Sequence, residues 1–341
     1  MKLLPGFRSS RKYYPMRFGV LVSLMVLLLS LPAVTRTFAA TEYRLEDDLI
    51  KLSNEHYEIA FRAADGGIAY ILDKATNQNI SEGSRDGNLW QAVLEKSDAV
   101  SSTSYGDQFA YTWDEASGTL TLRYSDVLEV TVTATVSDSP TLNLQATITN
   151  ATGATISGFR FPNGLRVVET DIEDALVPMM PGALLSTVFF EEGRTFVNQY
   201  PGVMFADYLA IRSERGNIAL YSQRNEQVQT TLIGYEHLED DSAATAMTHS
   251  YQTWIEDGKT WTAPGVMVQV GQDYPDSIAG YRSANKIDAY ASLTEKMGDG
   301  AQTYFAAPMY KLDLAVLRLK FTDLQKCHPH QRFRSEGCAA R

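Results

Sequence analysis

The chain has 341 residues, of which 30 are Lys or Arg and 41 are Asp or Glu, and its formal net charge is −11. This acidic balance argues against binding to nucleic acid or to anionic lipid, because both partners require a basic protein surface. Both cysteines lie within the last 16 residues, so the fold that precedes them does not depend on disulfides.

The first 40 residues have the composition of a secretory signal. They hold six basic residues and no acidic residue, an apolar run at positions 18–34, and small side chains at Thr37 and Ala39. We therefore expect cleavage near Ala39 or Ala40 and a secreted or extracytoplasmic protein, whose net charge without residues 1–40 would be −17. The alternative is an uncleaved anchor helix, in which case this segment alone would contact a membrane.

Residues 41–271 show the pattern of antiparallel β-strands. Between positions 118 and 152, apolar and polar residues alternate with period two, and turn residues separate three apolar faces. The three faces consist of Leu120, Leu122 and Tyr124, then Val130, Val132, Ala134 and Val136, then Leu142, Leu144, Ala146 and Ile148. Sheets with one solvated face produce this alternation, so the region is predicted to be one large antiparallel β-supersandwich.

The pattern changes at residues 272–325, where a short helix precedes a new apolar stretch. Pro275 in a first helical turn and Gly298 at the end bound a helical stripe. The stripe consists of Ile278, Tyr281, Ile287, Tyr290, Leu293 and Met297. The sequence that follows is predicted to be the truncated start of an α/β domain of the TIM-barrel type, because a complete barrel needs about 250 residues.

Three segments resemble the sandwich that precedes the catalytic barrel in certain large glycoside hydrolases. They are "LSNEHYEIAFRAADGGIAYILDKATNQNI" at 52–80, "YPGVMFADYLAIRSERGNIALYSQ" at 200–223 and "WTAPGVMVQVGQDYPDSIAGYR" at 261–282. The resemblance covers about residues 48–318 and is to the endo-α-N-acetylgalactosaminidase group, family 101, and its bacterial relatives. It implies a galactose mutarotase-like sandwich topology.

The same resemblance implies that this chain has no catalytic residue of its own. In such enzymes the two catalytic carboxylates lie at the ends of barrel strands, and those strands would follow the last residue here. The sequence also contains no phosphate-binding loop, serine-nucleophile motif or zinc-binding helix, so we expect no cofactor and no metal ion.

Contact with a sugar remains possible without catalysis. Pyranose rings stack on aromatic planes while neighbouring polar groups bind the hydroxyls. Trp254 and Trp261 flank a loop with Asp257 at its tip, and His249 lies on a predicted strand beside aromatic residues. These four are the candidate ligand-binding residues, with Trp90, Trp113, Tyr208 and Tyr221 as weaker candidates. The alternative for each aromatic residue is packing inside the sandwich.

The last 16 residues, "KCHPHQRFRSEGCAAR", differ from the rest of the chain. They carry four basic residues and one acidic residue, and they include Cys327, Cys338, His328 and His330. The spacing of these side chains does not match a known zinc site, whereas a disulfide between Cys327 and Cys338 is geometrically feasible in an oxidising compartment. The abrupt change of composition favours a third interpretation, a tail that is out of frame with the family sequence.

Taken together, the sequence predicts an exported, monomeric accessory domain of a glycoside hydrolase-like protein, with carbohydrate as its possible partner. Two alternatives stay open. One is a self-sufficient extracellular carbohydrate-binding module, and the other is a structural surface protein without a sugar ligand.

Export can be tested directly on the protein. If residues 1–40 are a cleaved signal, the mature N-terminus will be Ala40 or Thr41, as determined by mass spectrometry or Edman sequencing of secreted protein. Recovery of Met1 in the membrane fraction would instead establish the anchor.

Overall fold

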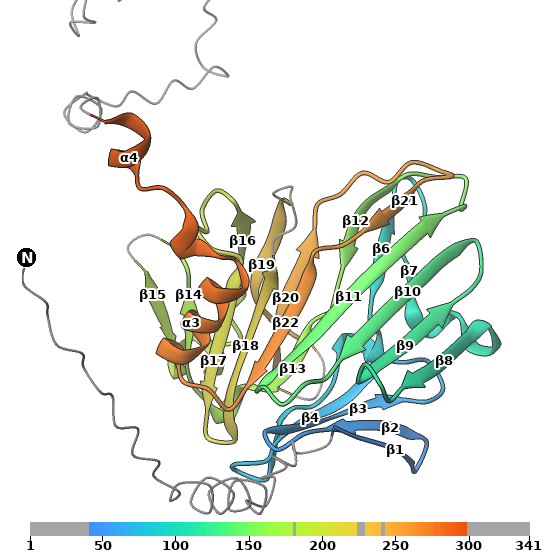
Figure 1. The fold of residues 1–341 in the computed structure, drawn as a ribbon, viewed down its shortest axis with the longest axis horizontal. Helices are drawn as coiled ribbons and strands as arrows, with labels where there is room; N and C mark the ends of the chain where they lie inside the picture. The colour runs from blue at the N-terminus through green and yellow to red at the C-terminus, as the bar shows by residue number, and fades with distance from the viewer. Residues whose placement is uncertain (1–40, 180–181, 224–228, 240–242, 299–341) are drawn as a thin grey trace, which may run out of the picture. The chain divides into compact units, whose positions relative to one another are not determined.

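The computed structural model describes residues 41–179, 182–223, 229–239 and 243–298. The described residues as far as Asn285 belong to one compact unit built on three antiparallel sheets (Figure 1). The predicted signal, barrel start and Cys/His tail lie outside the described residues. The antiparallel sandwich itself is confirmed.

The first sheet is a five-stranded meander in the order β1-β2-β3-β4-β5. Its strands are β1 (Glu42–Glu46), β2 (Leu49–Ser53), β3 (Tyr57–Arg62), β4 (Ile68–Asp73) and β5 (Gln78–Ser81). Each strand pairs with its sequence neighbour, which is the arrangement that short turns between alternating strands produce.

The second sheet has ten strands in the order β15-β14-β17-β18-β22-β11-β10-β9-β8, with β21 also paired to β11. Its strands are β8 (Phe109–Asp114), β9 (Thr119–Tyr124), β10 (Leu128–Thr135), β11 (Thr141–Asn150), β14 (Ile172–Val177), β15 (Ala183–Ser186), β17 (Tyr208–Ser213), β18 (Gly216–Gln223), β21 (Thr260–Thr262) and β22 (Gly265–Val270).

The third sheet has seven strands in the order β16-β19-β20-β12-β6-β7, with β13 also paired to β20. Its strands are β6 (Gln91–Leu94), β7 (Val100–Ser101), β12 (Ile156–Arg160), β13 (Leu165–Val168), β16 (Phe196–Tyr200), β19 (Thr231–His237) and β20 (Ala244–Tyr251). The short elements between strands are η1 (Arg85–Gly87), η2 (Ser102–Ser104), η3 (Gly106–Gln108), η4 (Glu169–Asp171) and α2 (Thr187–Glu191).

The apolar faces predicted from the alternation meet in the core between the two large sheets. Val132 lies opposite Leu122 on one side and Ala146 on the other, and all three side chains are fully buried. Trp90, just before β6, contacts the rings of Tyr124 and Phe159 across this core. Trp90 is therefore a packing residue. Trp113 likewise stacks on Tyr43 of β1, with ring centroids 5.2 Å apart.

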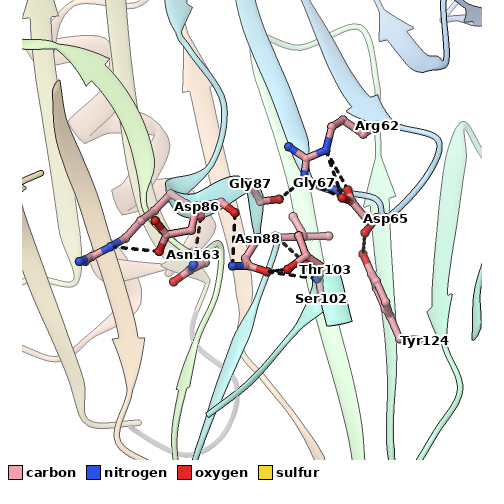
Figure 2. A network of polar contacts seen from close by, with 12 residues as sticks. Arg62, Asp65, Gly67, Asp86, Gly87, Asn88, Ser102, Thr103, Tyr124 and Asn163 are labelled. Atoms are coloured by element: carbon pink, nitrogen blue, oxygen red, sulfur yellow. Dashed lines mark hydrogen bonds and ion pairs between the residues drawn. The ribbon is translucent and has the colours of Figure 1, made fainter. Parts of the chain in front are cut away.

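A polar cluster joins the five-stranded sheet to its neighbours (Figure 2). The guanidinium of Arg62 donates to both oxygens of Asp65 and also to the carbonyl of Gly87 in η1. The backbone N–H of Gly67 donates to Asp65 Oδ1 (2.9 Å), and Tyr124 Oη donates to the Asp65 carbonyl (2.9 Å). The β3–β4 turn is thereby fixed to both η1 and β9.

The helical stripe is interrupted, which corrects the prediction of one continuous helix. Helix α3 (Tyr274–Ala284) begins with Asp273 as its N-cap and has Pro275 in its first turn. Asn285 then donates to the Tyr281 carbonyl (3.0 Å), and Lys286 adopts a left-handed backbone conformation (φ 50°) that ends the helix. Among the described residues no helix is long and apolar enough to cross a bilayer.

The residues after Asn285 belong to a second unit. Its described part contains the 3₁₀ turn η5 (Ile287–Ala289) and helix α4 (Leu293–Met297). Helix α4 has its own start signal, a capping box in which Ser292 and Glu295 exchange side-chain and backbone hydrogen bonds.

Helix α3 packs on the outer face of the ten-stranded sheet. Ser277 shares a 2.6 Å hydrogen bond with the hydroxyl of Tyr208, and the ring of Tyr281 makes edge contacts with Tyr208 and Tyr221. Asn285 also donates to the Ser222 carbonyl of β18 (3.0 Å). The helix therefore buries Tyr208 and Tyr221, which the sequence had presented as candidates for sugar contact.

The contribution of this helix can be measured through Tyr281, whose side chain is only 6 % exposed. Replacing Tyr281 with Ala should lower the free energy of unfolding by about 2–4 kcal/mol, because it leaves a cavity over Tyr208 and Tyr221. The matched control is Tyr290→Ala, at a tyrosine that is 55 % exposed, where the change should stay within about 0.5 kcal/mol. Urea titration monitored by circular dichroism gives both values; equal effects would show that α3 does not stabilise the sheet.

Candidate functional site

Three loops meet at the end of the sandwich where β21 pairs with β11 (Figure 1). They connect β6 to β7, β11 to β12, and β20 to β21. Ile156, the first residue of β12, forms an isolated antiparallel bridge with Ile255 of the β20–β21 loop, with reciprocal backbone hydrogen bonds of 3.0 and 2.9 Å. The third loop is attached by a hydrogen bond from Glu95 N to Thr155 O (2.8 Å).

The side chain of Asn150 links two of these loops by hydrogen bonds. It is the last residue of β11 and is fully buried. Its Nδ2 donates to the carbonyls of Ala154 (2.8 Å) and Ile255 (2.9 Å), while its Oδ1 accepts from the N–H and the hydroxyl of Thr152. All four hydrogen-bonding positions of the amide are thus in use, which is what a buried polar group requires.

A depression of about 440 Å³ lies between the loops. It is lined by Glu95, Lys96, Ser97, Gly153, Ala154, Thr155 and Asp257. Its volume falls in the range of small-molecule sites. Asp257 is held in place because its Oδ1 accepts from Gly153 N (2.9 Å), and its Oδ2 accepts no hydrogen bond from the described residues. The depression therefore presents one positioned acceptor, Asp257, among other polar side chains.

Trp254 is exposed and precedes Asp257, a lining residue of the depression, in the same β20–β21 loop. Ile255 and its bridge partner Ile156 are buried, and successive residues of extended chain point to opposite faces. Trp254 therefore points away from the core, and its side chain is 61 % exposed. An exposed indole in the same loop as the polar acceptor Asp257 offers the two kinds of contact that a pyranose makes.

Trp261 lies on the inner face and packs in the sandwich. It is opposite the buried Ile148 of β11, and its ring makes edge contacts with Phe159 (6.1 Å) and Tyr251 (5.6 Å). Trp254 and Trp261 share no ring contact in the described part of the chain, and sugar contact by this pair stays a prediction.

His249 is also inside, between the two large sheets, with 1 % of its surface exposed. Its Nδ1 lies 3.1 Å from the Phe161 carbonyl, and its Nε2 lies 3.0 Å from both Asp207 Oδ1 and Ser222 Oγ. A carbonyl and a carboxylate accept hydrogen bonds, so each ring nitrogen of His249 faces a group to which it can donate.

Burial alone would raise the pKa of Asp207, but the neighbouring groups prevail. The charge of His249 and hydrogen bonds from His249, Ser222 and Thr231 hold this pKa below its usual value. Thr231 Oγ1 donates to Asp207 Oδ2 at 3.0 Å. The result is a buried ion pair between β20 of one sheet and the residue that precedes β17 of the other.

This Ser-His-Asp group does not have the geometry of a nucleophilic triad. In a triad the carboxylate holds one ring nitrogen and the serine faces the other, whereas here Asp207 and Ser222 both approach Nε2. Ser222 is buried as well. The group is structural, and His249 is too deep to contact a ligand at the surface.

Of the four sequence candidates, the structure places Trp254 and Asp257 at one surface and Trp261 and His249 inside. Sequence reasoning missed Asn150, Lys96 and Thr155. The sequence shows a turn after Asn150. It does not show that this turn pairs with the loop of Asp257, because Gly153 and Asp257 are 104 residues apart and local patterns do not indicate contacts at that distance. Sugar binding by these residues stays a prediction.

Comparison with known proteins bears on the fold. No family model and no curated protein matches this chain. The α-N-acetylgalactosaminidase NagBb from Bifidobacterium bifidum, solved with GalNAc, is 10 % identical with a TM-score of 0.50; the match covers 70 % of this chain and 39 % of that one. At this identity the likeness shows the fold alone.

Two smaller proteins are matched over nearly their whole length. A galactose mutarotase related enzyme from Lactobacillus acidophilus is 9 % identical with a TM-score of 0.43, covering 66 % of this chain and 97 % of that one. A galactose mutarotase-like protein from Lactobacillus casei is 10 % identical with a TM-score of 0.44, covering 65 % and 99 %. The likeness to NagBb supports the predicted sandwich fold.

The buried ion pair predicts that substituting His249 destabilises the protein far more than substituting His56. Replacing His249 with Leu strands the Asp207 carboxylate and should destabilise the protein by about 3–5 kcal/mol. His56→Leu, at a side chain that is 33 % exposed, should cost less than about 1 kcal/mol. Chemical denaturation at pH 7 measures both, and a small effect at His249 would contradict the ion pair.

The wild type and His249→Leu should differ in how their stability depends on pH. In the wild type the lowered pKa of Asp207 gives stability that is present above the unfolded value of about 3.9 and is lost as the pH falls through the folded value. In His249→Leu, burial without a counter-ion raises the pKa of Asp207. Protonation of Asp207 at lower pH then removes the buried charge and restores part of the lost stability. The stability gap between the two proteins should therefore narrow from about pH 7 to about pH 4.5.

Proposed function

We propose that this chain is a non-catalytic carbohydrate-binding sandwich of an exported, glycoside hydrolase-like protein, and that the depression beside Trp254 is its sugar site. The observation that carries the proposal is the exposed indole of Trp254 in the β20–β21 loop, the loop whose Asp257 lines the depression. Export rests on residues 1–40 of the sequence. The fold shared with a glycoside hydrolase that was solved with GalNAc supports carbohydrate as the ligand class.

The chemistry of the site suits a sugar on two counts. The apolar C–H face of a pyranose can cover part of the Trp254 ring, which removes exposed apolar area from water. The hydroxyls on the ring edge would then reach the depression, where Asp257 Oδ2 accepts hydrogen bonds and the hydroxyls of Ser97 and Thr155 both donate and accept.

The rigidity of the loops favours affinity. Asn150 fixes two of them, and the Gly153–Asp257 hydrogen bond links the same two again. Because these loops are already ordered, a ligand that binds there does not have to compensate for the entropy of ordering them.

The test is a glycan array probed with the full chain, followed by calorimetry on the best ligand. Trp254→Ala should weaken binding roughly ten- to a hundredfold, the loss of about 1.4–3 kcal/mol expected for a stacking residue. Trp254→Tyr should retain most of the affinity. Neither variant should change the melting temperature, because the side chain is exposed.

Phe205→Ala is the matched control, since Phe205 is an aromatic residue of similar exposure that lies between β16 and β17, outside the three loops that line the depression. It should leave binding unchanged. Absence of any glycan ligand, or equal binding by wild type and Trp254→Ala, would contradict the proposed site and favour a structural surface protein.

A further inference from the structure

The loops around the depression carry more negative than positive charge. Four carboxylates and two ammonium groups lie in the β6–β7 and β20–β21 loops: Glu95, Asp98, Glu256 and Asp257, with Lys96 and Lys259. The depression itself is lined by Glu95, Lys96 and Asp257. The whole chain is also acidic, with a net charge of −11, so its long-range field does not attract anions.

Only one of these charged groups is fixed by a hydrogen bond among the described contacts. Gly153 N holds Asp257 Oδ1, which leaves Oδ2 as an acceptor at the depression. Lys96 and Glu95 are exposed neighbours in the β6–β7 loop. The Lys96 ammonium, which could bind an anion, therefore has the Glu95 carboxylate next to it in sequence. A ligand must therefore bring hydrogen-bond donors to Asp257.

We propose that the depression selects a pyranoside without an anionic group, whose hydroxyls donate to Asp257, and rejects sugars that carry a carboxylate or sulfate. This inference rests on the proposed function and specifies its ligand class. An anionic substituent near Asp257 would face a fixed carboxylate of like charge, and hydroxyl donors would not.

The experiment compares each neutral glycan that binds the full chain with its sulfated and its uronic acid form. The neutral form should bind at least about tenfold more tightly. Its affinity should stay constant between about 50 and 500 mM NaCl, because no charge pair forms with the ligand.

Asp257→Asn removes the charge and keeps an acceptor for Gly153 N–H. This variant should bind the neutral glycan several-fold more weakly. The ratio of its affinities for the neutral and the anionic form should fall towards one. The matched control is Asp114→Asn, at an exposed aspartate whose Oδ1 also accepts a backbone N–H, from Ala116 at 3.1 Å. Asp114 is the last residue of β8, outside the three loops around the depression, and its substitution should change neither value.

The outcomes separate the two proposals. The neutral ligand class is overturned if the wild type binds the anionic form as tightly as the neutral form or more tightly. It is also overturned if Asp257→Asn keeps the wild-type preference for the neutral form. In either case, weaker binding by Trp254→Ala would still support the sugar site. If the wild-type chain binds no glycan of either kind, both proposals fail.

Discussion

The ion pair of His249 and Asp207 constrains how the two large sheets sit against each other. Removing two charges from water is costly, so the arrangement is stable only while Phe161, Ser222 and Thr231 supply the remaining hydrogen bonds. Apolar side chains would tolerate small shifts of one sheet over the other, whereas these directional contacts would not. These contacts fix β20 relative to the facing sheet. They thereby also fix the start of the loop that contains Trp254.

Local pattern predicted the parts of the fold that local interactions determine. Strands β9 to β11 follow one another in sequence and pair as neighbours, so their alternation indicated both the strands and their buried faces. β20 is different, because every one of its residues is buried and it shows no wet face. Tyr208 and Tyr221 were misjudged for a related reason: periodicity shows that two faces differ but does not show that α3 covers one of them.

The candidate site was predictable only in part. Trp254 and Asp257 belong to a segment whose loop character is visible in its composition, and an aromatic residue beside a polar tip already suggests recognition. Trp261 differs from Trp254 only in the face on which it lies, and that face is set by pairing with Ile148 of a distant strand. The sharing of hydrogen bonds among three loops requires the folded sheets, so the sequence alone could not show it.

The position of Asn150 also limits how this end of the molecule can evolve. Its amide spans two loops at once, so adding or deleting a residue in either one would displace a carbonyl that the buried amide needs. Drift in loop length, the usual source of new specificity in sandwich proteins, is therefore restricted here. Relatives of this chain should diversify by exchanging side chains on loops of constant length.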